Sequence, residues 1–132
     1  MLYAVDTKMP VESLREGLTK ACADHKFGVL GVYDLRAKMR EKGADYANEC
    51  LIFEVCNPQK AKQVLEANPD VSTALPCRIS VYGTPGGKTR IATLLPTKLM
   101  ESFGTPELRS VASEVEASLK AIIDQAAGVG RA

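Results

Sequence analysis

The clearest strand signal in this chain is Cys-Leu-Ile-Phe-Glu-Val-Cys, residues 50–56. Its aliphatic, aromatic and β-branched side chains favour a buried β-strand. Asn57 follows directly and is a preferred helix N-cap, and Pro58 suits the first helical position. The sequence therefore predicts a strand over 50–56 that leads at once into a helix, which ends at Asn68-Pro69.

Before this strand, the chain alternates short strands with helices. Residues 2–5 and 27–33 have the composition of strands, and two glycines loosen the second one. Apolar residues at helical spacing predict an amphipathic helix over about 10–24. Asp34 is a good N-cap for a short helix over 35–42. This half of the chain therefore alternates strand and helix twice before the strand at 50–56.

After the central strand and its helix, the sequence predicts a β-hairpin and a long helix. Residues 77–82 and 88–95 are strand-like and flank the turn Thr84-Pro85-Gly86-Gly87. Thr105-Pro106 opens the longest helix. Its apolar stripe consists of Leu108, Val111, Val115, Leu119, Ile122 and Ala126. We expect this helix to dock on the sheet through the middle of that stripe, at Val111, Val115, Leu119 and Ile122.

The predicted order of elements is β-α-β-α-β-α-β-β-α, which indicates the α+β class. Five strands with helices on at least one face pack most economically as one mixed sheet that contains βαβ units. Residues 50–82 would form one such unit, a right-handed crossover between parallel strands. We expect a single domain over residues 1–127 and a frayed tail over 128–132.

The composition is that of an ordinary globular protein. The 132 residues fit one domain, with 45% hydrophobic and 25% charged residues. Seventeen Lys and Arg residues against sixteen Asp and Glu give a net charge of +1, so neither nucleic acid nor a membrane surface is expected as a partner. No apolar run approaches the length of a membrane span. We expect a soluble cytoplasmic protein, although Met1 could stand in place of a removed leader.

The four cysteines, Cys22, Cys50, Cys56 and Cys77, lie at wide and irregular gaps. A chain of this length can form a stable hydrophobic core without disulfide bonds, so free thiols are expected. Cys22 extends the apolar stripe of the first helix and is expected in the core. In a parallel crossover, Cys56 and Cys77 would lie at opposite ends of the sheet, about 15–20 Å apart. A disulfide needs Cα atoms within about 7 Å, so this pair is not expected to bridge.

Several tempting motifs are better explained as ordinary structure. The run from Gly83 to Thr89 has one residue too few for a phosphate-binding loop and leads into a strand, so a hairpin turn is favoured. His25 is the only histidine and is expected at the surface, near the C-terminus of a helix. The basic residues of the helix over 35–42 are scattered around it, whereas Leu35 and Met39 are expected to dock it on the sheet. No catalytic residue, metal ligand or cofactor is predicted.

The one candidate site is the turn formed by Cys56, Asn57 and Lys60. The first N–H groups of a helix lack intrahelical partners and carry partial positive charge. Such a position favours anions and thiolates, and Lys60 adds a cation nearby. The simpler alternative is that Cys56 is a small buried hydrophobe at the end of a strand.

Three stretches together resemble the bacterial family of domains of unknown function numbered 302. They are Phe27-Gly28-Val29 leading to Asp34-Leu35, Cys56-Asn57-Pro58 with Ala61, and Asn68-Pro69-Asp70 leading to Leu75-Pro76-Cys77-Arg78. The resemblance covers roughly residues 27–95 and departs from the family pattern at the polar insert 44–49. It implies a small α/β domain, often a homodimer, with no established activity and no catalytic residues.

Three classes of function fit these observations. The leading one is a non-enzymatic module, acting as a homodimer, that binds a small ligand or a partner. The second is a thiol-based redox or soft-metal protein that uses Cys56. The third is a small-molecule enzyme, although the sequence contains no recognisable acid–base constellation.

Overall fold

A computed structural model of the chain describes residues 1–128 and confirms the α+β class and the order of the predicted elements. The strands are β1 (Leu2–Thr7), β2 (Gly28–Asp34), β3 (Cys50–Cys56), β4 (Cys77–Gly83) and β5 (Thr89–Leu94). The helices are α1 (Leu14–Asp24), α2 (Leu35–Glu41), α3 (Pro58–Ala67), α4 (Pro96–Met100) and α5 (Pro106–Ala127), with short 3-10 helices η1 (Val11–Ser13), η2 (Pro69–Ala74) and η3 (Glu101–Phe103). Of the tail expected to fray, residues 129–132 lie outside the described part of the chain.

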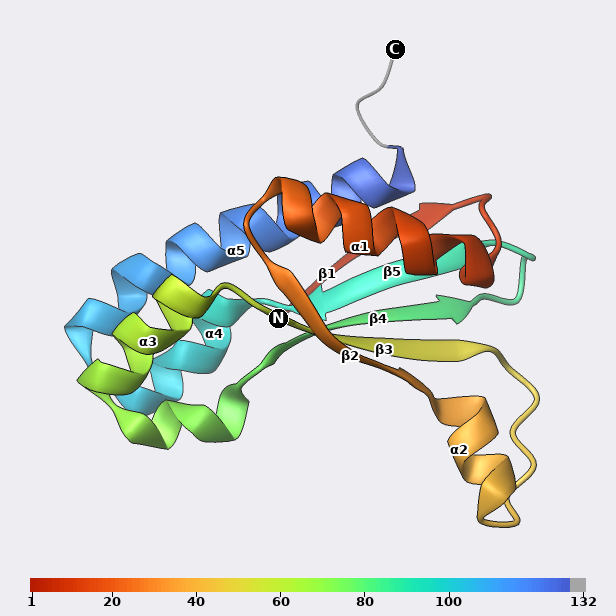
Figure 1. The fold of residues 1–132 in the computed structure, drawn as a ribbon, viewed down its shortest axis with the longest axis horizontal. Coiled ribbons are helices and arrows are strands. Elements are labelled where there is room, and N and C mark those ends of the chain that lie inside the picture. Colours follow the sequence, from red (N-terminus) through yellow and green to blue (C-terminus); the bar gives the residue numbers. More distant parts are fainter. Residues whose placement is uncertain (129–132) are drawn as a thin grey trace.

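The strands form one five-stranded sheet in the order β1-β5-β4-β3-β2, and every neighbouring pair is antiparallel (Figure 1). The expected parallel strands, with a crossover over residues 50–82, are therefore not found. The reason lies in the connection between β3 and β4. The helix α3 leads away from the sheet, and η2, which Asn68 caps, doubles back. The chain consequently re-enters the sheet at the end where it left, and β4 runs antiparallel to β3.

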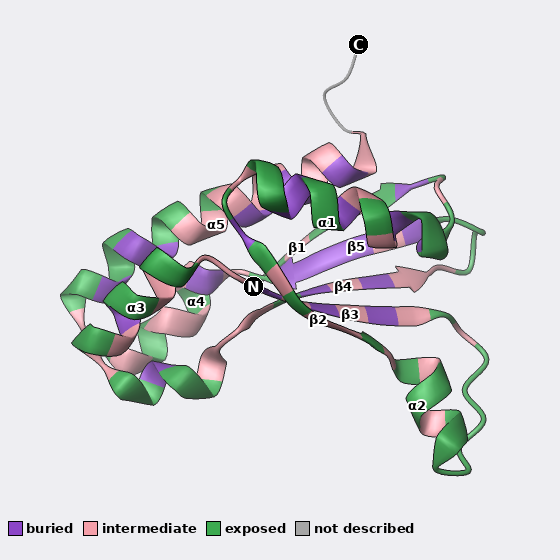
Figure 2. Ribbon diagram, in the orientation of Figure 1, coloured by how far each residue is buried: buried purple, intermediate pink, exposed green. Residues whose placement is uncertain are grey.

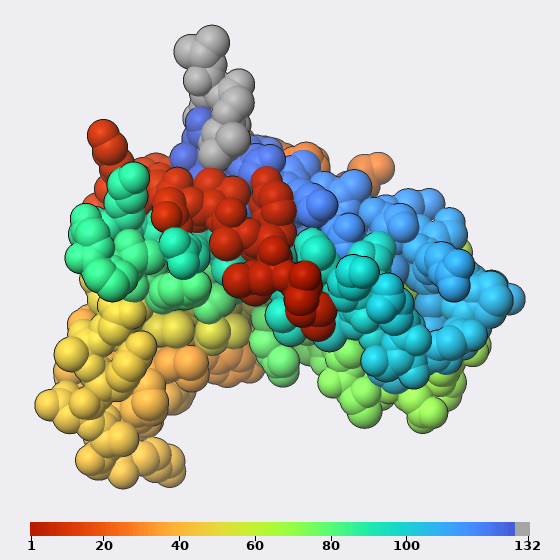
Figure 3. Space-filling view, turned by 180° about the vertical axis from the view of Figure 1, so that it is seen from behind, coloured from red at the N-terminus to blue at the C-terminus, as the bar shows by residue number. Residues whose placement is uncertain are grey.

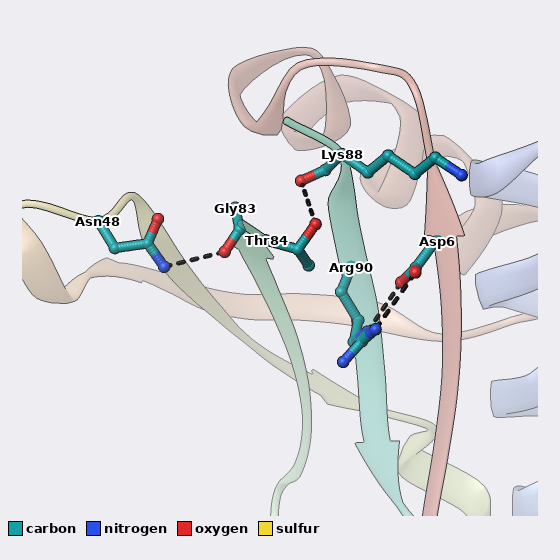
Figure 4. Close-up of polar contacts among 6 residues, drawn as sticks. All are labelled: Asp6, Asn48, Gly83, Thr84, Lys88 and Arg90. Atoms are coloured by element: carbon teal, nitrogen blue, oxygen red, sulfur yellow. Dashed lines mark hydrogen bonds and ion pairs between the residues drawn. The ribbon is translucent and has the colours of Figure 1, made fainter. Parts of the chain in front are cut away.

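The turn between β4 and β5 is a hairpin turn, as predicted, and not a phosphate-binding loop (Figure 4). The backbone N–H and the hydroxyl of Thr84 both donate to the carbonyl of Lys88, at 2.8 and 3.0 Å. Gly87 adopts a φ of 77°, which favours glycine. At the start of the turn, Asn48 Nδ2 donates to the carbonyl of Gly83 at 2.9 Å. A Cβ on Gly83 would lie 2.9 Å from Asn48 Oδ1, so a larger residue there would require the Asn48 side chain to shift.

The helices α1 and α5 cover one face of the sheet and leave the other face open (Figures 1 and 2). Along β3, buried and half-buried residues alternate, and the buried ones face the helices. Phe53, Leu119 and Ile122 are fully buried in the resulting core. Leu119 and Ile122 of the predicted stripe are buried in this core and Val115 packs against it, so α5 docks on the sheet through these residues as expected, whereas Val111 is buried in a separate cluster.

A second, smaller core lies beyond the end of the sheet, among α3, η2, α4 and α5. Its buried members are Val64, Val71, Leu108 and Val111. Val115 packs against both this cluster and the main core, so α5 is the element that joins them. The five-residue helix α4 was not predicted, because it is too short to show a periodic apolar pattern.

The two ends of the described chain are held together through β1, whose strand partner within residues 1–128 is β5, at the edge of the sheet. The Tyr3 hydroxyl donates to Asp124 Oδ1 of α5 at 2.5 Å, and Thr7 Oγ1 donates to the carbonyl of Ala127 at 3.5 Å. Lys120 lies 5.4 Å from the centre of the Tyr3 ring. The N-terminal strand is thus held by the last strand and the last helix.

The helix α2 does not dock on the sheet as expected. None of its residues is buried, and Leu35 is 37% exposed. Asp34 caps the helix by accepting a hydrogen bond from Ala37 N at 3.0 Å, as the sequence predicts. Together with the loop that follows it, α2 projects from the body as an arm (Figures 1 and 3).

Candidate functional site

A small cavity lies where the sheet ends against α3, α4 and α5. Its volume is about 40 Å³. Most of its walls are apolar, with contributions from Phe27, Val55, Val64, Leu75, Met100 and Val111. The predicted site residues Cys56, Asn57 and Lys60 all line it, and so does Cys77. The structure thus brings the three predicted residues to one cavity, together with a second cysteine.

The two cysteines of the cavity lie on neighbouring strands, contrary to the expectation that they occupy opposite ends of the sheet. Cys77 pairs with Val55, which directly precedes Cys56. Cys77 faces the helices with Val55, and Cys56, the last residue of β3, reaches the same cavity where the strand ends. Both thiols are free, as the sequence predicted, and so are Cys22 and Cys50.

The polar groups expected to attract an anion already have partners. Asn57 Oδ1 accepts a hydrogen bond from Lys60 N at 3.2 Å, which is the predicted N-cap of α3. Lys60 Nζ pairs with the carboxylate of Glu114 on α5. An anion at this turn would therefore have to compete with Glu114. The cavity is better suited to an apolar group than to a free anion.

Burial keeps the thiols of this region protonated. It raises the pKa of Cys56, whereas the position at a helix start was expected to favour the thiolate. Burial, and to a lesser extent the neighbouring Cys56, raises the pKa of Cys77 to about 11. Burial alone raises the pKa of Cys22 to about 11. Desolvation thus outweighs the attraction of the helix start for a negative charge at Cys56.

His25 has a structural role at the C-terminal end of α1, close to where the sequence placed it. Its Nε2 lies 3.1 Å from Gln125 Oε1 of α5, and Gln125 Nε2 donates to Asp24 at 2.7 Å. His25 therefore connects α1 to α5 instead of lining the cavity. Within residues 1–128, no three His, Cys, Asp or Glu side chains converge in a way that could hold a metal ion.

The most regular ion pair of the open face lies at its β1–β5 edge, away from the cavity (Figure 4). Arg90 donates to both carboxylate oxygens of Asp6, at 2.7 and 3.2 Å. The hydrogen bond from Arg90 is the main cause that lowers the pKa of Asp6. This pair joins the two strands across the face that the helices leave uncovered.

Sequence reasoning missed Phe27, Cys77 and Met100 as cavity residues. Phe27 directly precedes β2, and Cys77 is the first residue of β4. The two residues line the same cavity because the chain turns back through η2 and β4 runs antiparallel to β3. Met100 belongs to α4, whose only sequence signal is Pro96 at its first position. The two asparagine caps, Asn57 and Asn68, are the local signals of this return.

The fold and the site define a class of small α+β proteins: an antiparallel sheet with helices on one face and an apolar, thiol-lined cavity at its end. In the described part of the chain, no helix is long and apolar enough to cross a bilayer. The chain belongs to the family described as Domain of unknown function DUF302, whose model matches residues 3–126. The resemblance inferred from residues 27–95 is therefore confirmed and extends over most of the chain.

A solved structure supports the same assignment. The chain is similar to an uncharacterized conserved DUF302 protein from Bacillus stearothermophilus, with 35% sequence identity and a TM-score of 0.89. The similarity covers 95% of this chain and 97% of that chain. No significant match is found among curated proteins.

Proposed function

We propose that this protein is a non-enzymatic binding module that accepts a small apolar molecule in the cavity at the end of the sheet. The observation that carries the proposal is the wall of apolar side chains, interrupted by the thiols of Cys56 and Cys77 and bordered by Asn57 and Lys60. Ligand sites are typically concave and apolar, with a few polar groups at fixed positions.

The size of the cavity restricts the ligand to a compact molecule. A second cavity of about 70 Å³ shares Leu75, Pro76, Cys77 and Met100 with the first. Apolar cavities of roughly 150 Å³ stay dry and bind benzene. Because the two cavities together are smaller than that, benzene fits only if the side chains that line them move apart.

Benzene is expected to protect the cavity thiols from alkylation by N-ethylmaleimide. Without benzene, Cys56 should react faster than Cys22, because Cys56 is half-buried and Cys22 is fully buried. With benzene, the rates at Cys56 and Cys77 should fall several-fold. Cys50, at the opposite end of β3, is the internal control and should react at an unchanged rate. Site-resolved mass spectrometry of the native protein measures all four rates together.

Filling the cavity with a side chain provides a matched control. Ala61 lines the cavity from α3, whereas Ala67 lies exposed at the end of the same helix. Ala61→Leu should slow alkylation of Cys77 without benzene and remove the benzene effect, and Ala67→Leu should do neither. Equal benzene effects on all four cysteines, or none on any, would rule out this binding site.

We also propose that the module acts as a homodimer that associates through the open face of the sheet. The helices leave this face uncovered, and Figure 3 shows the molecule hollowed between the α2 arm and the segment around η2. A solvated antiparallel face is usually polar. Here Leu2, Ala4 and Leu94 share the face with Ile52 and Tyr33, and Leu2 is paired with Leu94.

The charges of this face support its contact with a second copy. Asp6 pairs with Arg90, and Glu54 lies 3.8 Å from Arg78. Each pair is neutral, so two copies of the face meet without repulsion between like charges. Five strands of about six residues give a footprint on the order of 500 Å². The α2 arm adds to that footprint and brings it towards the ~800 Å² per partner of a stable interface.

Leu94→Glu is expected to convert a dimer into a monomer. Leu94 is 47% exposed, so a charge there should leave the folded monomer intact while placing two carboxylates in the interface. Ala23→Glu is the control, because Ala23 is exposed on α1, which covers the opposite face of the sheet. Sedimentation velocity at micromolar concentration measures the mass. A monomeric unmodified protein would refute the dimer, and a dimeric Leu94→Glu variant would refute this interface.

The alternative function, a thiol-based redox or soft-metal role for Cys56, receives less support. The pKa of Cys56 is raised by burial, whereas a reactive cysteine requires a lowered one. Four free cysteines do accord with a reducing compartment, and we propose the cytoplasm on that ground.

A further inference from the structure

A third cavity, larger and more polar, lies on the outer side of α4. Its volume is about 360 Å³, within the range of small-molecule sites. It is bounded by α4, η3 and the first turns of α5. Hydroxyl side chains of Thr97, Thr105 and Ser113 line it, together with Glu101 and Arg109.

One side chain is common to this outer cavity and the two apolar ones. Met100, the last residue of α4, lines all three cavities. It is half-buried and packs against the smaller core. Methionine is unbranched and has three rotatable bonds, so it changes shape more easily than other core residues. A rotation of this side chain would join the outer polar space to the inner apolar space.

The charges of the outer cavity favour an anion. Glu101 pairs with Lys98 at 3.5 Å, so its charge is compensated. Arg109 makes no ion pair within the described residues, and it is exposed. The hydroxyl groups of Thr97 and Thr105 already donate, to Glu116 Oε1 at 2.6 Å and to the carbonyl of Phe103 at 3.3 Å, which leaves Ser113 as the hydroxyl donor beside Arg109. The cavity therefore presents the positive charge of Arg109, and it shares the side chain of Met100 with the apolar interior.

We infer that the three cavities form one site for a short amphipathic anion, with Met100 as the movable partition. The carboxylate of the ligand pairs with Arg109 in the outer cavity, and its apolar chain passes Met100 to reach the space beside Cys77. This inference rests on the proposed function and names the class of its ligand. A ligand with both a charged head group and an apolar chain uses both parts of the site, because the inner cavities are apolar and the outer one is polar.

Hexanoate and hexylamine test the inference, because they share an apolar chain and differ in the charge of the head group. Protection of Cys77 from N-ethylmaleimide, titrated with each compound, gives their apparent affinities for the native protein. We expect hexanoate to bind about fivefold more tightly than hexylamine, as suits a solvent-exposed ion pair. Arg109→Gln should remove this preference, and added salt should weaken it.

Two variants of Met100 test the partition. Met100→Ala should strengthen hexanoate binding about threefold or more, because no side chain has to move. Met100→Leu conserves the volume and the fold but is branched, so it should weaken hexanoate binding. Thermal melts of both variants establish that they are folded. Equal affinities for hexanoate and hexylamine, or affinities unchanged by both Met100 variants, would overturn the inference, whereas the benzene experiment would still stand for the apolar cavity.

Discussion

Phe53→Ala is expected to lower the free energy of unfolding by about 3–5 kcal/mol. Phe53 lies at the centre of β3, faces the core and has no solvent-accessible surface. Removing its ring leaves a space that the flanking strands β2 and β4 cannot close, since they are fixed by their hydrogen bonds. A domain of this size is stabilised by only about 5–15 kcal/mol, so the loss is large.

Urea denaturation followed by circular dichroism measures this effect, and the melting temperature should fall by roughly 10–20 °C. Tyr46→Ala is the matched control, because it also removes an aromatic ring but from a side chain that is 44% exposed. It should change the unfolding free energy by less than about 0.5 kcal/mol. A loss below about 1 kcal/mol for Phe53→Ala would mean that β3 is not the centre of the core.

The protein is expected to lose stability as the pH rises from 9 to 11. Burial raises the pKa of Cys22 from an ordinary value of 9.0 to about 11, so the folded state favours the neutral thiol. That preference is fully present below pH 9 and disappears as the pH passes through 11. At about 1.4 kcal/mol per pKa unit, Cys22 contributes on the order of 2–3 kcal/mol. The raised pKa of Cys77, also about 11, acts in the same direction.

Unfolding free energies measured in urea at pH 8 and pH 11, under reducing conditions, test this dependence. Cys22→Ala removes one titrating group. The unfolding free energy of this variant should therefore fall less between pH 8 and pH 11 than that of the unmodified protein, even if the variant is less stable at pH 8. Tyr3 extends the effect to higher pH, because its hydrogen bond to Asp124 raises its pKa to about 12. The same pH slope in Cys22→Ala and in the unmodified protein would contradict the assignment of Cys22.

Local signals in the sequence were sufficient for most of the elements. Asn57 and Asp34 cap the helices that they were expected to cap, and residues 50–56 form the strand that their composition predicted. These predictions succeed because capping and strand propensity depend on residues only a few positions apart.

The direction of β4 and the composition of the cavity could not be read in the same way. Both depend on how α3 and η2 turn the chain back, which is decided by packing between Val64, Val71 and Leu108, residues far apart in the sequence. The sequence also predicted that the positive start of α3 favours the thiolate of Cys56. It did not show how strongly burial of this thiol raises its pKa. Met100 was not predicted as a cavity residue, because its helix α4 has five residues and is too short to show a periodic apolar pattern.

The position of β1 has a consequence for the order in which the fold can be completed. Protein synthesis releases the N-terminus first, yet within the described residues β1 pairs with β5 alone, and β5 ends at Leu94. The strands β2 to β5 are each adjacent to the next one made, so they can pair as they leave the ribosome. Leu2 and the rest of β1 must instead wait, unpaired, until most of the chain has been translated, and Tyr3 waits longer still for Asp124. The first strand to be synthesised is thus the last to be incorporated.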